Sequence, residues 1–134
     1  MRYCYATILF LFILGSCHSQ IIQTKTYFDL DSTKIREIFH YKASDSTLHG
    51  SYEAFHINGS LQIFGWYLKN KPDSIWTYFY ENGRKRASGR YKQGIPIGQW
   101  KYYFENSNLK SKGNLNGAHY QNRPNIEQLN ISTI

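Results

Sequence analysis

The sequence lacks the motifs of common catalytic sites. It has no Gly-x-Ser-x-Gly nucleophile turn, no glycine-rich phosphate loop and no zincin-type pair of helical histidines. The five histidines, His18, His40, His49, His56 and His119, are scattered without the short spacings or cysteine neighbours of a metal site. We therefore expect no enzymatic activity, no cofactor and no metal.

Cysteine is scarce, and no hydrophobic run is long. Arg2 precedes an apolar run over residues 5–14, which ends at Gly15 and Ser16. A membrane-spanning helix needs roughly 20 apolar residues, so residues 1–16 are typical of a secretory signal peptide instead. Of the two cysteines, Cys4 lies inside this segment and only Cys17 follows it, so no intramolecular disulfide is expected.

The end of this segment, Leu14-Gly15-Ser16-Cys17, resembles a bacterial lipobox. The resemblance implies cleavage before Cys17 and its acylation, and acyl chains contribute about 0.8 kcal/mol per buried CH₂ to membrane binding. His18 follows in place of the aspartate that retains many lipoproteins at the inner membrane, which favours the outer membrane. Ordinary signal cleavage, for example after Ser19, is the alternative.

The remaining chain is basic. Removing residues 1–16 reduces the 16 Lys and Arg residues by one against 9 Asp and Glu, which leaves a formal charge of +6. In a bacterial envelope such a charge favours anionic lipid or an acidic polymer over nucleic acid. No nucleic-acid partner is therefore expected.

A repeat of 24 residues dominates the sequence after residue 50. It aligns aromatic residues, turn asparagines and glycines in three successive units. The clearest aligned sets are Tyr52/Trp76/Trp100, Asn58/Asn82/Asn106, Gly65/Gly89/Gly113 and Tyr67/Tyr91/Leu115.

Each unit has the pattern of a β-hairpin. Asn82-Gly83 separates two strand-like runs, and a two-residue type I′ turn would need positive φ at both residues. Ser107 replaces the glycine in the third unit, which predicts a slightly looser turn there. The fold class predicted is all-β, with tandem antiparallel hairpins in one elongated twisted sheet.

These features divide the chain into five segments. Terminal repeats tend to be atypical because one face meets solvent. The expected boundaries are a signal peptide at 1–16, a tether at 17–26, a degenerate capping hairpin at 27–49, hairpin repeats at 50–117 and a C-terminal tail at 118–134.

The third unit carries a family resemblance. The run Gly98-Gln-Trp-Lys-Tyr-Tyr-Phe-Glu-Asn, followed by Lys112-Gly113, resembles a MORN-repeat variant of the YwqK type. The resemblance covers residues 50–117, and the first unit matches it poorly. It implies a single file of antiparallel hairpins with no intrinsic enzymatic role. YwqK-type proteins are described as antitoxin components, so the resemblance also suggests an antitoxin or immunity role.

Alternation along the strands predicts two candidate surfaces. An aromatic face forms either the core between repeats or an exposed binding platform. A basic stripe is either a solvated face that resists edge pairing or a site for an acidic partner. The aromatic set is Trp76, Tyr78, Tyr80, Trp100, Tyr102 and Phe104, and the basic set is Arg86, Arg90, Lys110 and Lys112.

The favoured function is a non-enzymatic, membrane-tethered interaction module in the bacterial envelope, held by acyl chains on Cys17. Its partner is an unknown protein or acidic polymer, and the sequence leaves the oligomeric state open. The alternative is a YwqK-type antitoxin or immunity component. A third hypothesis, an envelope enzyme built from His40, His56 and Glu81, predicts loss of function when these residues are replaced by alanine.

Overall fold

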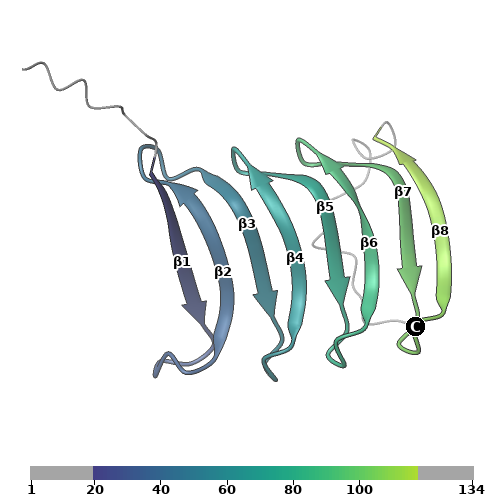
Figure 1. The fold of residues 1–134 in the computed structure, drawn as a ribbon, viewed down its shortest axis with the longest axis horizontal. Helices are drawn as coiled ribbons and strands as arrows, with labels where there is room; N and C mark the ends of the chain where they lie inside the picture. The colour runs from purple at the N-terminus through teal and green to yellow at the C-terminus, as the bar shows by residue number, and fades with distance from the viewer. Residues whose placement is uncertain (1–19, 118–134) are drawn as a thin grey trace, which may run out of the picture.

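The computed structural model describes residues 20–117, which form one antiparallel sheet (Figure 1). The eight strands are β1 (Ile21–Tyr27), β2 (Ile35–Lys42), β3 (Leu48–Phe55), β4 (Leu61–Leu68), β5 (Lys71–Phe79), β6 (Lys85–Lys92), β7 (Ile95–Tyr103) and β8 (Leu109–Asn116). The predicted all-β fold of tandem hairpins is confirmed.

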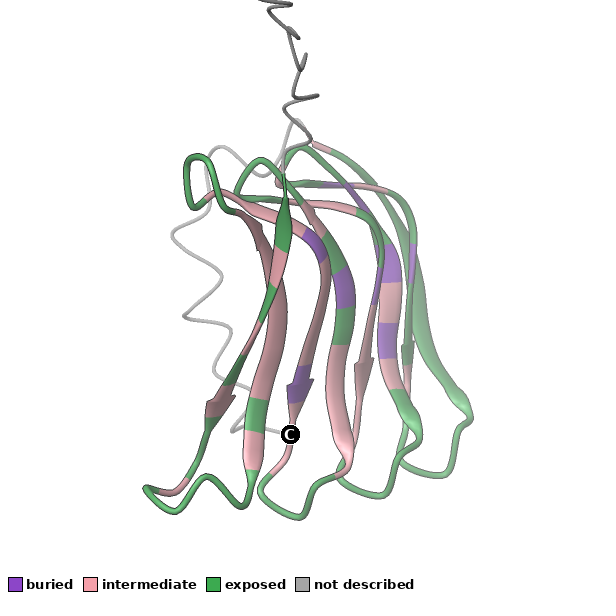
Figure 2. Ribbon diagram, turned by 60° about the vertical axis from the view of Figure 1, so that its left-hand side comes forward, coloured by how far each residue is buried: buried purple, intermediate pink, exposed green. Residues whose placement is uncertain are grey.

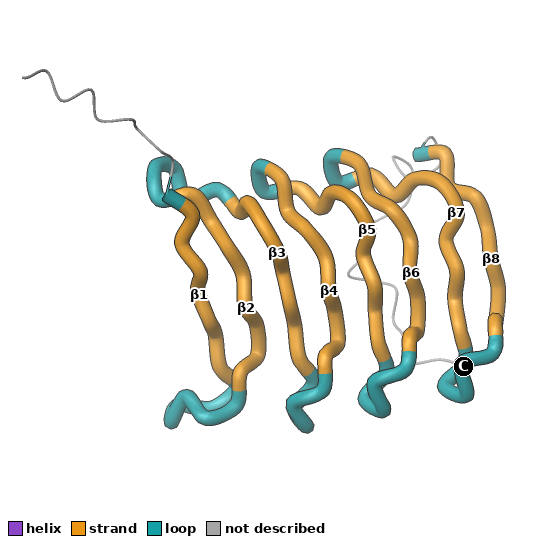
Figure 3. Tube along the Cα trace, in the orientation of Figure 1, coloured by secondary structure: helices purple, strands orange, loops and turns teal. Residues whose placement is uncertain are grey.

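The strands lie in the sheet in the order in which they occur in the sequence. Each strand pairs with the next one along the chain, from β1 at one edge to β8 at the other, and the sheet stays open. The connections alternate between the two ends of the strands (Figure 3). This is the topology of consecutive hairpins, in which each unit contacts only its neighbours in sequence.

The backbone follows the 24-residue period closely. Strands β4, β6 and β8 begin at Leu61, Lys85 and Leu109, which are spaced by that period. Left-handed backbone conformations recur with the same spacing at Lys69, Gln93 and Gly117. The repeat seen in the sequence is therefore a repeat of backbone conformation.

The hairpin turns differ from the expected type I′ turn. Gly59, Gly83 and Ser107 have positive φ, but the asparagines that precede them do not. In the second unit the N–H of Gly83 donates to the carbonyl of Tyr80 (2.9 Å), and the N–H of Tyr80 donates to the carbonyl of Arg84 (2.8 Å). This is a three-residue loop, a type I turn followed by one left-handed residue.

Ser107 does not loosen the third turn. Its φ is 71° and its N–H donates to the carbonyl of Phe104 at 2.8 Å, as the glycines do in the other units. The Asn106 side chain also accepts from the N–H of Asn108 at 2.9 Å, matching the contact from Asn82 to Arg84. The asparagine therefore closes the loop through its side-chain oxygen, and the left-handed position tolerates serine.

The N-terminal hairpin begins earlier than the sequence indicates. All of strand β1, Ile21–Tyr27, except its last residue lies in the segment 17–26 assigned to a tether, and the strand pairs with β2 along its whole length. The predicted signal peptide, Cys17 and the C-terminal tail lie outside the described residues. Between residues 20 and 117, no helix is long and apolar enough to cross a membrane.

One face of the sheet carries the core. Trp76 and Trp100 are 4% and 5% exposed, and Ala54, Ala87 and Tyr91 are buried with them. Figure 2 shows that buried positions lie on the central strands, whereas β8 is exposed along its whole length. The aromatic face predicted from the sequence is thus the packed face at its two tryptophans.

Glycines make this packing possible. A Cβ at Gly65 would lie 2.2 Å from the Trp76 ring, and a Cβ at Gly89 would lie 2.1 Å from the Trp100 ring. Each indole therefore lies directly on the backbone of the preceding hairpin. The glycines and tryptophans that recur in the repeat therefore pack against each other.

Candidate functional site

The two tryptophans of the predicted aromatic surface are structural. The Trp76 indole N–H donates to the carbonyls of Trp66 (3.2 Å) and Asp73 (3.1 Å). The Tyr91 ring meets the Trp100 ring edge-on, with 5.2 Å between their centroids. Rings held in this way have little surface left for a ligand.

The other aromatic residues of this surface differ in exposure. Tyr78 is half-buried beside Trp100, and the Tyr80 hydroxyl donates to the carbonyl of Tyr103 at 2.8 Å. Tyr102 and Phe104 are 39% and 48% exposed. Of these aromatic side chains, only the two nearest β8 are therefore exposed to solvent.

The predicted basic stripe is divided between two faces. The Arg86 guanidinium lies 6.0 Å from the centroid of the Tyr78 ring, and the Lys110 ammonium lies 5.6 Å from that of Phe104. Both cations therefore lie on the aromatic face. Arg90 pairs with Ile75 and Lys112 pairs with Lys101, and both cations lie on the opposite face.

β-Bulges cause this division. Tyr78 pairs with Ala87 and Phe79 pairs with Lys85, which leaves Arg86 as an extra residue in β6. A register shift after Tyr102 likewise leaves Lys110 as an extra residue in β8. An extra residue breaks the strict alternation of faces on which the sequence prediction depended.

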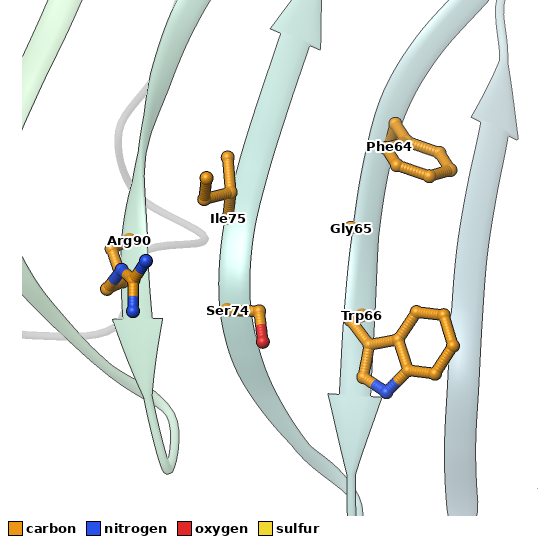
Figure 4. Close-up of a pocket in the computed structure, with 6 residues that line it drawn as sticks. All are labelled: Phe64, Gly65, Trp66, Ser74, Ile75 and Arg90. Atoms are coloured by element: carbon orange, nitrogen blue, oxygen red, sulfur yellow. The ribbon is translucent and has the colours of Figure 1, made fainter.

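A shallow pocket lies on the face opposite the core, across β4, β5 and β6 (Figure 4). Its lining residues are Phe64, Gly65, Trp66, Ser74, Ile75 and Arg90. Phe64 is 44% exposed, Trp66 is 45% exposed and Ile75 is 56% exposed. We call Phe64, Trp66, Ile75 and Arg90 the outer patch.

The local backbone shapes the outer patch. Phe64 pairs with Thr77 and Trp66 pairs with Asp73, so Gly65 alone faces the three residues from Ser74 to Trp76. Ser74 takes a left-handed φ of 64° within this irregularity. The irregular pairing lies next to the Gly65 position on which Trp76 packs, so core packing and outer patch share one local distortion.

The repeat itself indicates that the outer patch is not structural. In the alignment of the three units, Phe64 is equivalent to Ser88 and Lys112. Trp66 is equivalent to Arg90 and Asn114, and Ile75 is equivalent to Ser51 and Gln99. The equivalent positions are polar in the other units and the sheet still forms there. Phe64 and Trp66 lie in the first unit and Ile75 in the second, and each apolar side chain occurs in only one of the three units.

Phe64, Trp66 and Ile75 are not among the surface residues predicted from the sequence. Those predictions rest on residues that recur in the repeat, and recurrence selects residues needed for the fold. These residues could have been found as departures from the repeat. A side chain that occurs in one unit alone is not needed to form the hairpin, so it can serve binding instead.

The residues of the enzyme hypothesis make structural contacts. His56 Nε2 lies 3.1 Å from the carbonyl of Phe79, and His40 Nδ1 lies 3.0 Å from that of Ser51. The backbone carbonyl of Glu81 accepts from Ser60 at 2.9 Å. Within residues 20–117, no three His, Cys, Asp or Glu side chains gather in a way that could hold a metal ion.

Burial changes the acidity of tyrosines in the core, away from the outer patch. Desolvation raises the pKa of Tyr91 and of Tyr52, and a hydrogen bond to Glu37 raises that of Tyr52 further. Both phenols stay neutral throughout the physiological range. Their role is packing and hydrogen bonding.

Comparison with family models, with curated proteins and with solved structures found no match to this chain. The class defined by the fold is an all-β protein whose single open antiparallel sheet is made of consecutive hairpins. No family is identified beyond that class.

Proposed function

We propose that this protein is a non-enzymatic interaction module that binds a protein partner through the outer patch. The observation that carries the proposal is the exposure of Phe64, Trp66 and Ile75 at positions that are polar in the other units of the repeat. Contiguous exposed apolar side chains usually mark an interaction site. Trp and Arg are also the residue types that dominate binding energy at protein interfaces.

The chemistry of the patch limits the partner. Burying one such apolar side chain contributes about 1.5–3 kcal/mol, so three of them supply a useful part of a protein interface. Arg90, exposed beside Ile75, can form a charge-assisted hydrogen bond with a carboxylate. The expected partner surface has an apolar centre with an acidic group at its margin.

The proposal includes a membrane tether at Cys17, as a bacterial lipoprotein with the outer membrane favoured. Its support is the lipobox-like run before Cys17. Strand β1 begins at Ile21, so Cys17 is at most about 14 Å from the sheet even if the link is fully extended. A lipid on Cys17 would therefore hold the β1 edge close to the membrane.

The 24-residue hairpin unit supports classification of the repeats as a MORN-type variant of the YwqK kind. On that classification a toxin is one candidate for the protein partner. An envelope toxin encoded near this gene would favour an immunity role over a scaffold.

The test replaces the outer patch by the residues that the repeat carries elsewhere. The triple variant Phe64→Ser, Trp66→Arg and Ile75→Gln takes its side chains from the columns of Ser88, Arg90 and Gln99. The full chain is purified from its producing cells with bound proteins, which are then identified by mass spectrometry.

We expect the variant to fold with unchanged thermal midpoint and to lose the partner. Trp66→Arg alone should weaken binding by about 2 kcal/mol, or about 30-fold. The matched control, Phe104→Ser, removes an exposed aromatic side chain from the other face and should retain the partner. Equal recovery of the partner by the triple variant and the wild type would contradict the proposal.

A further inference from the structure

At the β8 edge, a contact that repeats along the sheet lacks its aromatic partner among residues 20–117. Gly65 is covered by Trp76, and Gly89 is covered by Trp100. Gly113 is the third glycine of this aligned set, and apart from Gly113 and its two chain neighbours no atom of the described residues lies within 4 Å of where its Cβ would be. An indole-sized site on the core face of β8 thus has no ring from residues 20–117.

The surroundings of Gly113 resemble those of the filled sites, with Leu115 in the place of a tyrosine. Tyr67 and Tyr91 meet Trp76 and Trp100 edge-on, each with 5.2 Å between centroids. Leu115 stands in the same column and is 37% exposed. A ring over Gly113 would be bordered by Leu115 and by Tyr102, which is 39% exposed.

The backbone of β8 is also available on its outer side. Strand β8 pairs with β7 alone among the described strands, and all of its residues are exposed. An edge strand of this kind presents unpaired N–H and C=O groups to an added strand. An added strand could therefore form backbone hydrogen bonds with β8 and, at the same time, place a side chain over Gly113.

Charge decides among the possible occupants. On the face away from the core, Lys112 pairs directly with Lys101 across the two strands. A second copy adding its own β8 would bring further lysines to this pair, whereas acidic side chains would relieve the repulsion. The next residue in the tryptophan column of this chain is Pro124, which has no ring of that size.

We propose that the β8 edge binds an extended segment of another protein by strand addition. That segment carries an aromatic residue on the face that meets Gly113, and acidic residues on the face that meets Lys101 and Lys112. This site lies on a different strand from the outer patch and is independent of it.

The test uses the full chain in detergent micelles and a fluorescein-labelled peptide, Thr-Glu-Thr-Glu-Trp-Glu-Thr-Glu-Thr, with binding followed by fluorescence anisotropy. The peptide should bind, and replacing its tryptophan by alanine or its glutamates by lysine should weaken binding by about tenfold or more. Absence of binding by the original peptide would overturn the proposal.

Substitutions on β8 locate the site. Gly113→Val fills the position of the ring, and its backbone φ and open surroundings accommodate the side chain, so the thermal midpoint should not fall. Peptide affinity should fall by about tenfold. Asn114→Val is the matched control, because it makes a comparable change on the opposite face and should leave the affinity unaltered. Equal affinity of Gly113→Val and the wild type would overturn the proposal.

Two further outcomes would also overturn it, because they identify a different occupant. Tight peptide binding by a chain ending at Gly117, with none by the full chain, would assign the edge to residues 118–134. A full-chain dimer that Gly113→Val dissociates, measured by analytical ultracentrifugation, would assign it to a second copy.

Discussion

Replacement of Gly89 by alanine tests the packing that holds the hairpins together. The added Cβ would lie 2.1 Å from one carbon of the Trp100 ring and 2.2 Å from a second, whereas carbon atoms in contact prefer about 3.5–4.0 Å. The ring would have to move by more than an ångström. It is 5% exposed and packed against Tyr91, so it cannot retreat without breaking other contacts.

The expected loss of unfolding free energy for Gly89→Ala is about 2–4 kcal/mol, between the cost of overpacking a core and that of losing a buried tryptophan. For a sheet of this size each kcal/mol lowers the thermal midpoint by about 4–8 °C. Urea unfolding, followed by tryptophan fluorescence and by far-ultraviolet circular dichroism, measures the loss.

Gly113→Ala is the matched control. It makes the same substitution in the same column, but the described residues leave open space around its Cβ. Alanine has fewer backbone conformations than glycine in the unfolded chain. The unfolding free energy of this variant should therefore be unchanged or higher by about 0.4–1 kcal/mol. Equal destabilisation by both substitutions would contradict this explanation, because the effect would then come from the backbone and not from the indole contact.

Three other outcomes follow from the same contacts. Trp100→Ala should cost about 3–5 kcal/mol in urea unfolding, whereas Trp66→Ala, at an exposed position, should stay within about 0.5 kcal/mol. Tyr80→Phe removes a 2.8 Å hydrogen bond to a carbonyl in the next repeat and should cost about 1 kcal/mol in the same assay. Burial raises the pKa of Tyr52 and Tyr91, so their contribution to stability is complete below the ordinary tyrosine pKa of about 10 and is lost as the pH rises above it; thermal midpoints measured from pH 8 to 11 should fall above about pH 10.

The sequence predicted the strands and their order because the 24-residue period reports directly on a repeating backbone. Trp76 recurs one period later as Trp100, and Gly89 repeats Gly65 from one period earlier. Such recurrence arises when each unit packs on its neighbour in the same way. Strand type and hairpin pairing therefore required no knowledge of distant contacts.

The details that failed were those that depend on a single added residue. The Asn82-Gly83 pair fits either a two-residue or a three-residue turn, and only the φ values distinguish them. Arg86 is an extra residue in its strand, and a bulge leaves no mark in the alternation of side chains along a sequence. The basic stripe was therefore expected on one face and lies on two.

The outer patch could have been predicted from the sequence by asking which residues break the repeat. Trp66 replaces an Arg or Asn, and Ile75 replaces a Ser or Gln, at positions that alternate away from the core. Its exposure, however, depends on how neighbouring side chains cover one another across three strands. That property is tertiary and needs the structure.

Site-specific photocrosslinking from position 66 tests whether the outer patch binds a protein partner. A photoreactive amino acid replaces Trp66 in the full chain inside its producing cells, and a second sample carries it in place of Phe104, which is 48% exposed on the other face. We expect one protein adduct from position 66 that is absent from position 104 and that disappears in the Phe64→Ser, Ile75→Gln background. No adduct at position 66, or the same adducts from both positions, would contradict the assignment of the outer patch as the binding surface.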